Sequence, residues 1–377
     1  MYYLESLQLK GFRNYHNEQL QFHPRLNLVI GENAQGKTNL LESIYYLSVT
    51  RSFRTNRDQE LANFEDRYFY LKGSFIKDDL KHVVQASYRQ NDQLKISVNS
   101  NQADRFDHLQ SFPVVVFSPD DLQIIRDGPA VRRRFLNLEG SRLNPLYFED
   151  LKNYQRILMQ RNFLLKEKRY HPKIRDYLEP WDQALADLGS SIISSRLVLI
   201  EAIEKEASIF FETMTGSFEE LTLSYSSTID FCENPETTRN NFLRTLSEKR
   251  DAELKRGTTI IGPHLDDLKV MINGSDSRRY SSQGQKRTAA LALKMAEVSL
   301  FRMRNNDSPI ILLDDVFSEF DNSRKGYLLK FIREIAGQCF ISTATDLNGL
   351  IEKNNSDYKI ITVKQGSAFD ETDQFST

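Results

Sequence analysis

A glycine-rich turn near the amino end restricts the possible folds of this chain more than any other feature of its sequence. Residues 29–40 read VIGENAQGKTNL and match the spacing GxxxxGK followed by Ser or Thr. An apolar run that favours a strand precedes the turn, and apolar residues at helical spacing follow it. The order of strand, loop and helix predicts an α/β fold in which this loop binds the phosphates of a nucleotide.

Each residue type in this loop suits a nucleotide. Glycines let successive backbone N–H groups point at the phosphates, and the following helix adds the positive end of its dipole. Lys37 is expected to neutralise the β- and γ-phosphates, and the Thr38 hydroxyl to bind Mg²⁺. Because no NKxD motif that would read guanine occurs, the expected nucleotide is ATP. The residues of the loop expected to bind it are Gly31, Glu32, Asn33, Ala34, Gln35, Gly36, Lys37 and Thr38.

Such a loop needs an acidic partner for the metal ion. The apolar run Ile310–Leu313 predicts a buried strand that ends in Asp314 and Asp315. Asp314 is expected to hold Mg²⁺ through a water molecule, and Asp315 to orient or deprotonate the attacking water. With Lys37 these two carboxylates form the predicted catalytic group, and the alternative is that the pair only ends the strand in a turn.

The polar turn SSQGQKRT, residues 281–288, opens a helix that is expected from about Lys286 to Met303. In ATP-binding-cassette proteins a serine–glycine turn at this place in the order of motifs caps the γ-phosphate of a nucleotide held by another subunit. A small hydroxyl, backbone N–H groups and the positive end of a helix suit that role. A plain helix cap is the alternative interpretation.

Hydrophobic patterning predicts strands and helices in different parts of the chain. Short runs between residues 68 and 98 predict an antiparallel meander, and FPVVVFSP at 112–119 predicts a buried strand. Apolar residues at steps of three, four or seven from Trp181 to Phe210 predict one long amphipathic helix. A coiled coil is the alternative, although Gly189 and a run of serines interrupt the spacing.

These patterns predict a discontinuous domain organisation. We expect an α/β head built from residues 1–120 and 257–377, with a mainly helical domain, residues 121–256, inserted between its halves. Towards the end the sequence predicts a helix at about 323–335 and a strand in QCFIST, whereas the polar tail from Gly366 onward is expected to fray.

Charge gives only a local hint of a nucleic-acid partner. The formal net charge of -2 argues neither for nor against a polyanion. A cluster of arginines early in the helical domain either contacts DNA phosphates or pairs with carboxylates, and Arg156 and Arg161 give a weaker signal. Aromatic residues do not alternate with basic ones, so backbone contact with duplex or junction DNA is expected. The cluster consists of Arg126, Arg132, Arg133 and Arg134.

Cysteine, histidine and hydropathy patterns exclude other classes of protein. Cys232 and Cys339 lie far apart without a CxxC partner, which indicates a reducing compartment and no disulfide framework. The six histidines show no metal-ligand spacing. The sequence has no basic-then-apolar leader and no run of ~20 apolar residues, so we expect a cytoplasmic protein without a membrane partner.

Taken together, six stretches resemble one family, the bacterial recombination mediator RecF. Its members are P-loop ATPase heads of the SMC and Rad50 type that lack a long coiled coil. The resemblance runs from about residue 1 to about residue 346 and is looser in the helical middle. The stretches are LQLKGFRNY, GENAQGKTNLLESIYYLSVTRSFRT, VVVFSPDDLQIIRDGPAVRRRFLN, IGPHLDDL, YSSQGQKRTAALALKMAE and ILLDDVFSEFD.

The resemblance implies a protein that dimerises on DNA around two molecules of ATP and hydrolyses them weakly, in a DNA-dependent manner. It implies action at single-strand gaps and stalled forks, where such a protein, with RecO and RecR, helps load RecA on single-stranded DNA and supports the SOS response. It also assigns Ser282, Gly284 and Gln285 to a signature contributed in trans, and Asp321 to a loop that lies across the dimer interface.

Departures from the wider cassette class favour slow turnover. Asp315 stands where many cassette ATPases carry glutamate, which shortens the reach to the water. FISTATD has no switch histidine, so Thr343 or Thr345 takes its place or the role is absent, and SPDD, residues 118–121, occupies the neighbourhood of the glutamine sensor. The alternative function is the ATPase subunit of a membrane transporter, but SSQGQ in place of LSGGQ and the long helical insert disfavour it.

Overall fold

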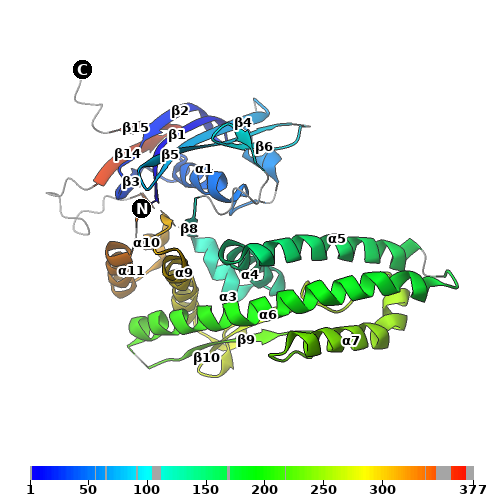
Figure 1. The fold of residues 1–377 in the computed structure, drawn as a ribbon. Coiled ribbons are helices and arrows are strands. Elements are labelled where there is room, and N and C mark those ends of the chain that lie inside the picture. The colour runs from blue at the N-terminus through cyan, green and yellow to red at the C-terminus, as the bar shows by residue number, and fades with distance from the viewer. Residues whose placement is uncertain are drawn as a thin grey trace, which may run out of the picture. The chain divides into compact units, whose positions relative to one another are not determined.

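Two compact units make up the computed structural model of the chain. The head unit contains Met1–Asp121 and Glu297–Thr377, so both ends of the chain belong to it, and the helical unit contains Leu122–Ala296 (Figure 1). An α/β head with a helical insertion is therefore confirmed. The structure describes residues 2–55, 57–63, 66–90, 92–103, 112–167, 170–216, 218–335, 337–344 and 358–370.

The first sheet of the head unit is antiparallel. Its strands are β1 (Tyr2–Phe12), β2 (Tyr15–Gln21), β4 (Tyr68–Lys77), β5 (Leu80–Arg89), β6 (Lys95–Val98) and β7 (Asn101–Gln102). They lie in the order β2-β1-β4-β5-β6-β7, and the pairing of β4 with β5 and of β5 with β6 confirms the predicted meander. Leu7 and Leu9 alternate with polar residues along β1 and are buried, as a sheet with one covered face requires.

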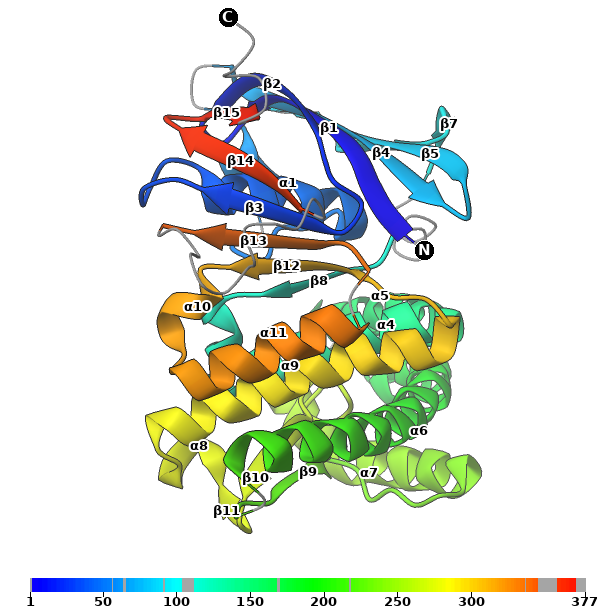
Figure 2. The ribbon, with the colours of Figure 1, turned by 90° about the vertical axis from the view of Figure 1, so that its left-hand side faces the viewer.

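The second sheet of the head unit contains the strand that precedes the glycine-rich loop, residues 31–38. Its strands are β3 (Leu26–Ile30), β8 (Val114–Phe117), β12 (Ile310–Asp314), β13 (Cys339–Thr343), β14 (Tyr358–Lys364) and β15 (Ser367–Asp370). The order is β15-β14-β3-β13-β12-β8, with all neighbours parallel except β14 and β15. Figure 2 shows α1 (Lys37–Val49), which follows the loop, lying between the two sheets.

Shorter elements complete the head unit. A 3-10 turn, η1, spans Asp58–Leu61. The strand β8 ends at Phe117, and a second 3-10 turn, η2 (Pro119–Leu122), begins at the proline that was expected to stop it. The helices α10 (Val316–Glu319) and α11 (Asn322–Ile335) follow the acidic strand β12. Residues 366–370 differ from the expectation of a frayed tail, because Gly366 forms the turn of the hairpin β14-β15, and the expectation for residues 371–377 lies outside the described residues. The hairpin backbone is paired, so it is held in place despite its polar sequence.

The helical unit consists of helices around a small sheet. Its elements are α3 (Gln123–Arg126), α4 (Pro129–Leu143), α5 (Pro145–Glu167), α6 (Ile174–Thr215), β9 (Leu221–Ser226), α7 (Pro235–Arg256), β10 (Asp267–Ile272), β11 (Ser275–Asp276), α8 (Ser277–Tyr280) and the first part of α9 (Gln283–Asn305). The long helix α6 has 42 residues and contains the predicted amphipathic stretch. Gly189 lies where a Cβ atom would approach the Phe242 ring of α7 to 2.4 Å, so it permits close packing of the two helices.

The carboxyl boundary of the insert differs from the predicted one. Residues 257–296, which the sequence assigned to the head, group with the helical unit. One reason is that β10 pairs along its whole length with β9. Another is that the IGPHLDDL stretch makes polar contacts with α5 and β9: His264 Nδ1 lies 2.8 Å from the Tyr154 hydroxyl, and Asp266 accepts a hydrogen bond from Tyr225.

No helix in the described part of the chain is long and apolar enough to cross a bilayer.

Candidate nucleotide-binding site

The glycine-rich loop lies between β3 and α1, where the sequence places it. Gly36 has a φ of 122°, and a Cβ atom there would also lie 2.7 Å from the Asn14 amide nitrogen, so only glycine fits. A Cβ on Gly31 would lie 2.3 Å from the Val363 carbonyl oxygen of β14. Both glycines of the motif are therefore required by the local packing.

The side chain of Lys37 contacts the backbone of the glycine-rich loop. Its Nζ donates hydrogen bonds to the backbone oxygens of Gly31 at 2.6 Å and Glu32 at 2.8 Å, and the residue is only 6% exposed. Burial lowers the Lys37 pKa, an effect opposed by the negative charges of Asp315 and Asp314. The ammonium group is thus held within the loop without a direct carboxylate partner among the described residues, which suits it to an incoming anion.

The acidic strand meets the loop through a chain of hydrogen bonds. Thr38 Oγ1 donates to Asp314 Oδ1 at 2.8 Å, and Ser342 Oγ at the end of β13 donates to the same oxygen at 2.9 Å. Ser342 Oγ in turn accepts from the Asp315 backbone N–H at 2.9 Å. β13 lies between β3 and β12, so the threonine and the aspartate approach each other across it.

The electrostatics of Asp314 fit a cation site. The carboxylate is buried, and desolvation raises its pKa, while the bonds from Thr38 and Ser342 act in the other direction. No group of three or more His, Cys, Asp or Glu side chains that would hold a metal ion by itself occurs in the described ranges. An ion such as Mg²⁺ at Thr38 and Asp314 would therefore take its other ligands from water and phosphate oxygens.

Asp315 has a different environment from its neighbour. It adopts a left-handed conformation, with φ 51° and ψ 24°, and forms the cap position before α10. Its side chain is only partly buried. The strained backbone turns the chain immediately after the buried strand. As a result the Asp314 carboxylate is buried at the end of the sheet, whereas the Asp315 carboxylate is directed towards solvent.

Two supports of the loop were not foreseen from the sequence. Asn14 Nδ2 donates to the Gln35 backbone oxygen at 3.0 Å, and the Gly366 N–H donates to the same oxygen at 3.0 Å. Gly366 has a φ of 76°, and a Cβ there would lie 2.1 Å from the Asn14 backbone oxygen. The available signals in the sequence were Asn14 in GFRNY and Gly366 in KQGS. Neither motif shows that its residue binds the backbone of the loop.

A buried carboxylate, Glu42, connects α1 to the segments that flank it. Its oxygens accept hydrogen bonds from Arg13 at 2.9 and 2.8 Å and lie 3.4 Å from Arg54, and Ser52 also donates to it. The Glu42 side chain has no exposed surface, whereas that of Arg54 is 41% exposed. The arginine pair compensates a charge that could not be buried alone.

The predicted signature forms a reciprocal helix cap in the helical unit. The Gln285 N–H donates to Ser282 Oγ at 3.2 Å, and the Ser282 N–H donates to Gln285 Oε1 at 2.7 Å. Gln285 Nε2 also donates to Glu219 Oε1 at 2.6 Å. α9 starts at Gln283, earlier than expected, with Gly284 in its first turn. The cap interpretation is thus realised, and the turn remains exposed or half-buried at the helix start.

Asp321 caps α11. Its Oδ1 accepts a hydrogen bond from the Arg324 N–H at 3.0 Å, and its other oxygen pairs with the Arg324 side chain. The bond from the Arg324 backbone is the main reason that the pKa of Asp321 is lowered. The residue is exposed, so capping leaves its surface accessible.

Most of the predicted DNA-contact arginines have internal partners. Arg132 is 5% exposed and forms a two-pronged ion pair with Asp267, at 2.7 and 2.9 Å. Arg133 donates to the Asp266 backbone oxygen at 2.8 Å, and Arg126 binds Gln283. These contacts favour the carboxylate-pairing alternative for Arg132, which is not available to DNA. The fourth member, Arg134, is exposed.

Other predicted positions are less well placed to act on a ligand. Arg161 is fully buried and pairs with Asp182 and Glu253. Thr343 ends β13 and is buried, and Thr345 lies outside the described residues. In SPDD, the Ser118 N–H donates to Asp121 Oδ2 at 2.7 Å, which closes a turn.

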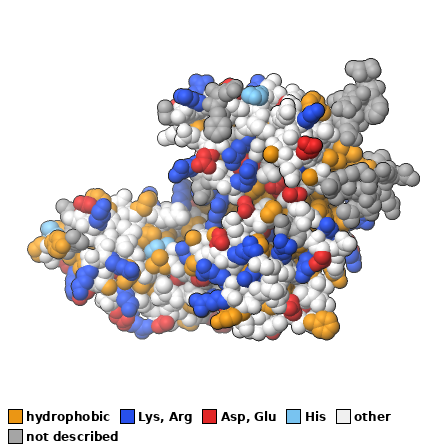
Figure 3. All heavy atoms as spheres, turned by 180° about the vertical axis from the view of Figure 1, so that it is seen from behind, with side chains coloured by type: hydrophobic (Ala, Val, Ile, Leu, Met, Phe, Trp, Pro, Cys, Tyr) orange, Lys and Arg blue, Asp and Glu red, His pale blue; other side chains and the backbone are white. Residues whose placement is uncertain are grey.

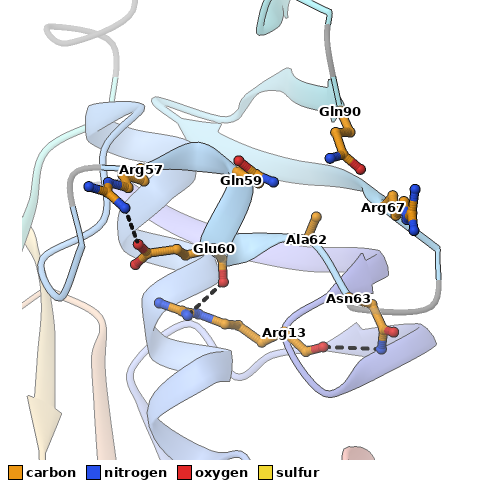
Figure 4. A pocket seen from close by; sticks show the side chains of 8 residues that line it. All are labelled: Arg13, Arg57, Gln59, Glu60, Ala62, Asn63, Arg67 and Gln90. Carbon is orange, nitrogen blue, oxygen red and sulfur yellow. Dashed lines mark hydrogen bonds and ion pairs between the residues drawn. The ribbon is translucent and has the colours of Figure 1, made fainter.

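A hollow of about 730 Å³ also lies in the head unit (Figure 4). Two of its three arginines have carboxylate partners, because Arg13 pairs with Glu42 and Arg57 lies 3.8 Å from a Glu60 oxygen. The lining residues are Arg13, Arg57, Gln59, Glu60, Ala62, Asn63, Arg67 and Gln90.

Comparisons with known proteins agree with this geometry. The family model of the RecF/RecN/SMC N-terminal domain matches residues 3–368. The DNA replication and repair protein RecF of Acetivibrio thermocellus is 36% identical over 370 residues, covering 97% of this chain and 100% of that protein. The RecF of Natranaerobius thermophilus is 39% identical over 361 residues, covering 93% of each chain.

Solved structures give the same result. A structure of the recombination mediator protein RecF with ATP, in the RecFOR pathway, superposes with a TM-score of 0.90 at 36% identity, covering 98% of this chain and 97% of that one. An Smc head domain derived from Pyrococcus furiosus, with a TM-score of 0.55 and 18% identity over 98% of this chain and 96% of that one, shares the fold.

Proposed function

The chain belongs to the RecF family, and from that premise we propose that it is a recombination mediator that binds ATP and dimerises on DNA. The carrying observation is the hydrogen bond of 2.8 Å from Thr38 to Asp314, which joins the phosphate-binding loop to the acidic strand. A magnesium ion that binds a nucleotide takes its protein ligands from a hydroxyl and a carboxylate beside the phosphate-binding loop, and Thr38 and Asp314 are such a pair.

The loop residues have defined tasks in this proposal. Backbone N–H groups of Gly31 to Gly36 bind the phosphates, and the start of α1 adds its dipole. Lys37 exchanges the carbonyl oxygens of Gly31 and Glu32 for β- and γ-phosphate oxygens, which are better partners for a desolvated ammonium group. Thr38 and Asp314 would hold Mg²⁺, which would neutralise part of the charge on the phosphates.

The signature completes the site from a second copy of the chain. Ser282, Gly284 and Gln285 lie at the start of a helix whose N-terminal dipole attracts a γ-phosphate. Gly284 keeps the approach open, because it has no side chain. ATP bound in one protomer and capped by the signature of its partner would make nucleotide binding a condition of dimerisation. Asp321, exposed at the start of α11, is proposed to lie at the same interface.

Hydrolysis is proposed to be slow and DNA-dependent. Asp315 orients or deprotonates the attacking water, and an aspartate reaches less far than a glutamate. Its position on a strained cap outside the buried strand makes its placement sensitive to the partner protomer. ATP then serves mainly as a dimerisation switch, and its hydrolysis lets the two protomers dissociate.

The biological role follows from the family. We propose that the protein acts in the cytoplasm at single-strand gaps and stalled forks, where with RecO and RecR it assists RecA loading and supports the SOS response. The relatives are named as replication and repair proteins, and a solved relative is assigned to the RecFOR pathway.

Two variants test the composite site. Lys37→Ala should abolish both ATP binding and ATP-dependent dimerisation, because it removes the cation that faces the phosphates. Ser282→Arg should leave ATP binding intact and prevent dimerisation, because the large cation fills the place of the partner's phosphate. Equilibrium titration with a fluorescent ATP analogue and light scattering measure the two properties separately.

Lys330→Ala serves as the control, because this lysine is 72% exposed on α11 and has no task in the proposal. It should bind ATP and dimerise like the wild type. ATP-dependent dimers of the Ser282→Arg variant would contradict the contribution of the signature in trans.

A further inference from the structure

One face of the antiparallel sheet in the head unit is polar over five strands. Partners in an antiparallel pair share a face, so the register defines it: Lys10 lies opposite Asn17 and Tyr70, and Tyr70 lies opposite Ser87. The opposite face carries the buried residues of the core. We call the former the basic sheet face; it consists of Gln8, Lys10, Asn17, Gln19, Tyr68, Tyr70, Lys72, Gln85, Ser87, Arg89, Lys95 and Ser97.

The helix α1 packs on the side of the sheet opposite to the basic sheet face. A Cβ atom on Gly73 would lie 3.0 Å from Leu47 of α1, and Gly73 is paired with Leu7 and Val84, both buried. Lys72, adjacent to Gly73 on the same strand, must then point away from α1. It is half-buried, and Lys95 and Arg89 are exposed.

The charged residues in the list above are all cations. They are Lys10, Lys72, Lys95 and Arg89, and none of these four forms an ion pair within the described residues. Beyond the listed residues the same side of β5 continues to Lys81, whose charge is compensated by Glu5 at 2.6 Å. Glu18 of β2 lies opposite Leu9 and so belongs to the other face. The whole chain has a net charge of -2, so the four cations produce a positive electrostatic potential that is local to this face.

This arrangement differs from the other groups of arginines in the chain. Arg132 is compensated by Asp267, and Arg13 by Glu42, whereas no carboxylate pairs with Lys10, Lys72, Lys95 or Arg89 in the part of the chain that the structure describes. Their neighbours on the basic sheet face are carboxamides and hydroxyls, which are the side chains that contact phosphate and sugar alongside Lys and Arg. Figure 3, which views the molecule from behind, shows basic and acidic side chains interspersed over the face seen there.

The spacing of the cations fits a duplex. Strands lie about 4.8 Å apart, so Lys10 and Lys95, three strands apart, are separated by roughly 14 Å. Lys72 is the diagonal neighbour of Lys10, and Arg89 that of Lys95, each at about 7–8 Å. A duplex carries one charge per ~1.7 Å of its axis, so this area meets several phosphates.

The aromatic residues argue against a single strand as the occupant. Stacking needs an exposed ring, but Tyr70 is half-buried and its hydroxyl donates to Gln85 Oε1 at 3.2 Å. We propose that the basic sheet face binds the sugar-phosphate backbone of duplex DNA. The proposal rests on the proposed function, to which it adds the contact surface, and it replaces the arginine cluster as the main DNA contact.

The salt dependence of binding to a duplex of about 30 base pairs, with ATP present, tests the proposal. Four phosphate contacts predict a slope of log K against log salt of about -3.6, so affinity falls about 150-fold between 50 and 200 mM salt. Replacing Lys10, Lys72 and Lys95 together by Gln leaves one contact and a fall of about 3.5-fold. Each single replacement changes the slope by about 0.9. Fluorescence anisotropy measures these slopes.

The control is Lys330→Gln, which removes an exposed lysine of the same unit that lies 4.0 Å from a Glu334 oxygen, and it should leave the slope unchanged. Titration with ATP in the absence of DNA and thermal unfolding should give wild-type values for every variant, because the replaced side chains contact neither the loop nor the core.

Three outcomes overturn the proposal and differ in meaning. A triple variant that keeps the wild-type slope while binding ATP shows that DNA binds elsewhere, and the proposed function survives. A wild type that binds ATP but no DNA removes the DNA part of that function as well. In the third outcome the lysine replacements change the salt slope for single-stranded DNA of the same length, by about 0.7 per lysine, but leave the slope for the duplex unchanged. This result rejects duplex DNA as the ligand of the face.

Discussion

Replacing Ser282 separates the two roles of its hydroxyl, the helix cap seen in the structure and the proposed contact with a phosphate in trans. The cap consists of two reciprocal bonds, 3.2 Å from the Gln285 N–H to Ser282 Oγ and 2.7 Å from the Ser282 N–H to Gln285 Oε1. Ser282→Ala removes the first and should cost about 1 kcal/mol of stability. Ser282→Asp keeps an acceptor of equal quality and should cost almost nothing.

The aspartate has a large effect only if a phosphate faces it. Two like charges 4 Å apart near a protein surface repel by about 4 kcal/mol, which corresponds to a roughly thousandfold loss in affinity at each site. Ser282→Asp should therefore unfold like the wild type but fail to dimerise with ATP. Ser282→Ala should show the opposite balance, with lower stability and a smaller defect in dimerisation.

Urea unfolding followed by circular dichroism measures the first property, and light scattering with and without ATP the second. Binding of ATP to the monomer provides the control, because the P-loop is not changed. The reasoning about the signature is refuted if the aspartate variant forms ATP-dependent dimers as well as the wild type does.

Four further perturbations follow from the structure. Arg13→Ala should destabilise the protein by about 3–5 kcal/mol in urea unfolding, since it leaves the buried Glu42 carboxylate with Arg54 as its remaining cationic partner among the described residues, and Arg13→Lys should recover part of the loss. Gly366→Ala should weaken ATP binding in a nucleotide titration, because a residue with φ of 76° and a Cβ 2.1 Å from a backbone oxygen displaces the support of the loop. Asp315→Asn should trap the ATP dimer, and turnover of ATP at the wild-type rate would remove Asp315 from its role. Burial lowers the pKa of His264 to about 4, so the unfolded chain binds the extra proton first, and stability should fall as pH drops from about 6.5 to about 4; His264→Gln should show a shallower fall in pH-dependent unfolding.

Local patterns were sufficient to place the glycine-rich loop and the acidic strand that contacts it. The sequence places Gly31 to Thr38 between a strand and a helix, and Asp314 at the end of a buried strand, and the structure brings Thr38 and Asp314 into contact. These predictions rest on spacing along short segments, where each residue type is restricted by the chemistry of phosphate and metal.

The features that the sequence did not predict depend on contacts between residues that are far apart in the chain. Ser342 completes the acidic network only because β13 lies between β3 and β12, and no motif in QCFIST specifies that order. Arg132 looked like a DNA contact because its partner, Asp267, is 135 residues away in the sequence. The basic sheet face was likewise hidden, since its lysines come from three strands whose register sets them side by side.

The strand order of the second sheet has a consequence for synthesis of the protein. β3 carries the loop, yet both strands that flank it, β13 and β14, come from the far end of the chain, as does Gly366, which binds the loop backbone. A nascent chain that has exposed the loop on the ribosome has no flanking strands to hold it. Pairings this distant in sequence form slowly, and affinity for ATP should appear only after translation has passed residue 366.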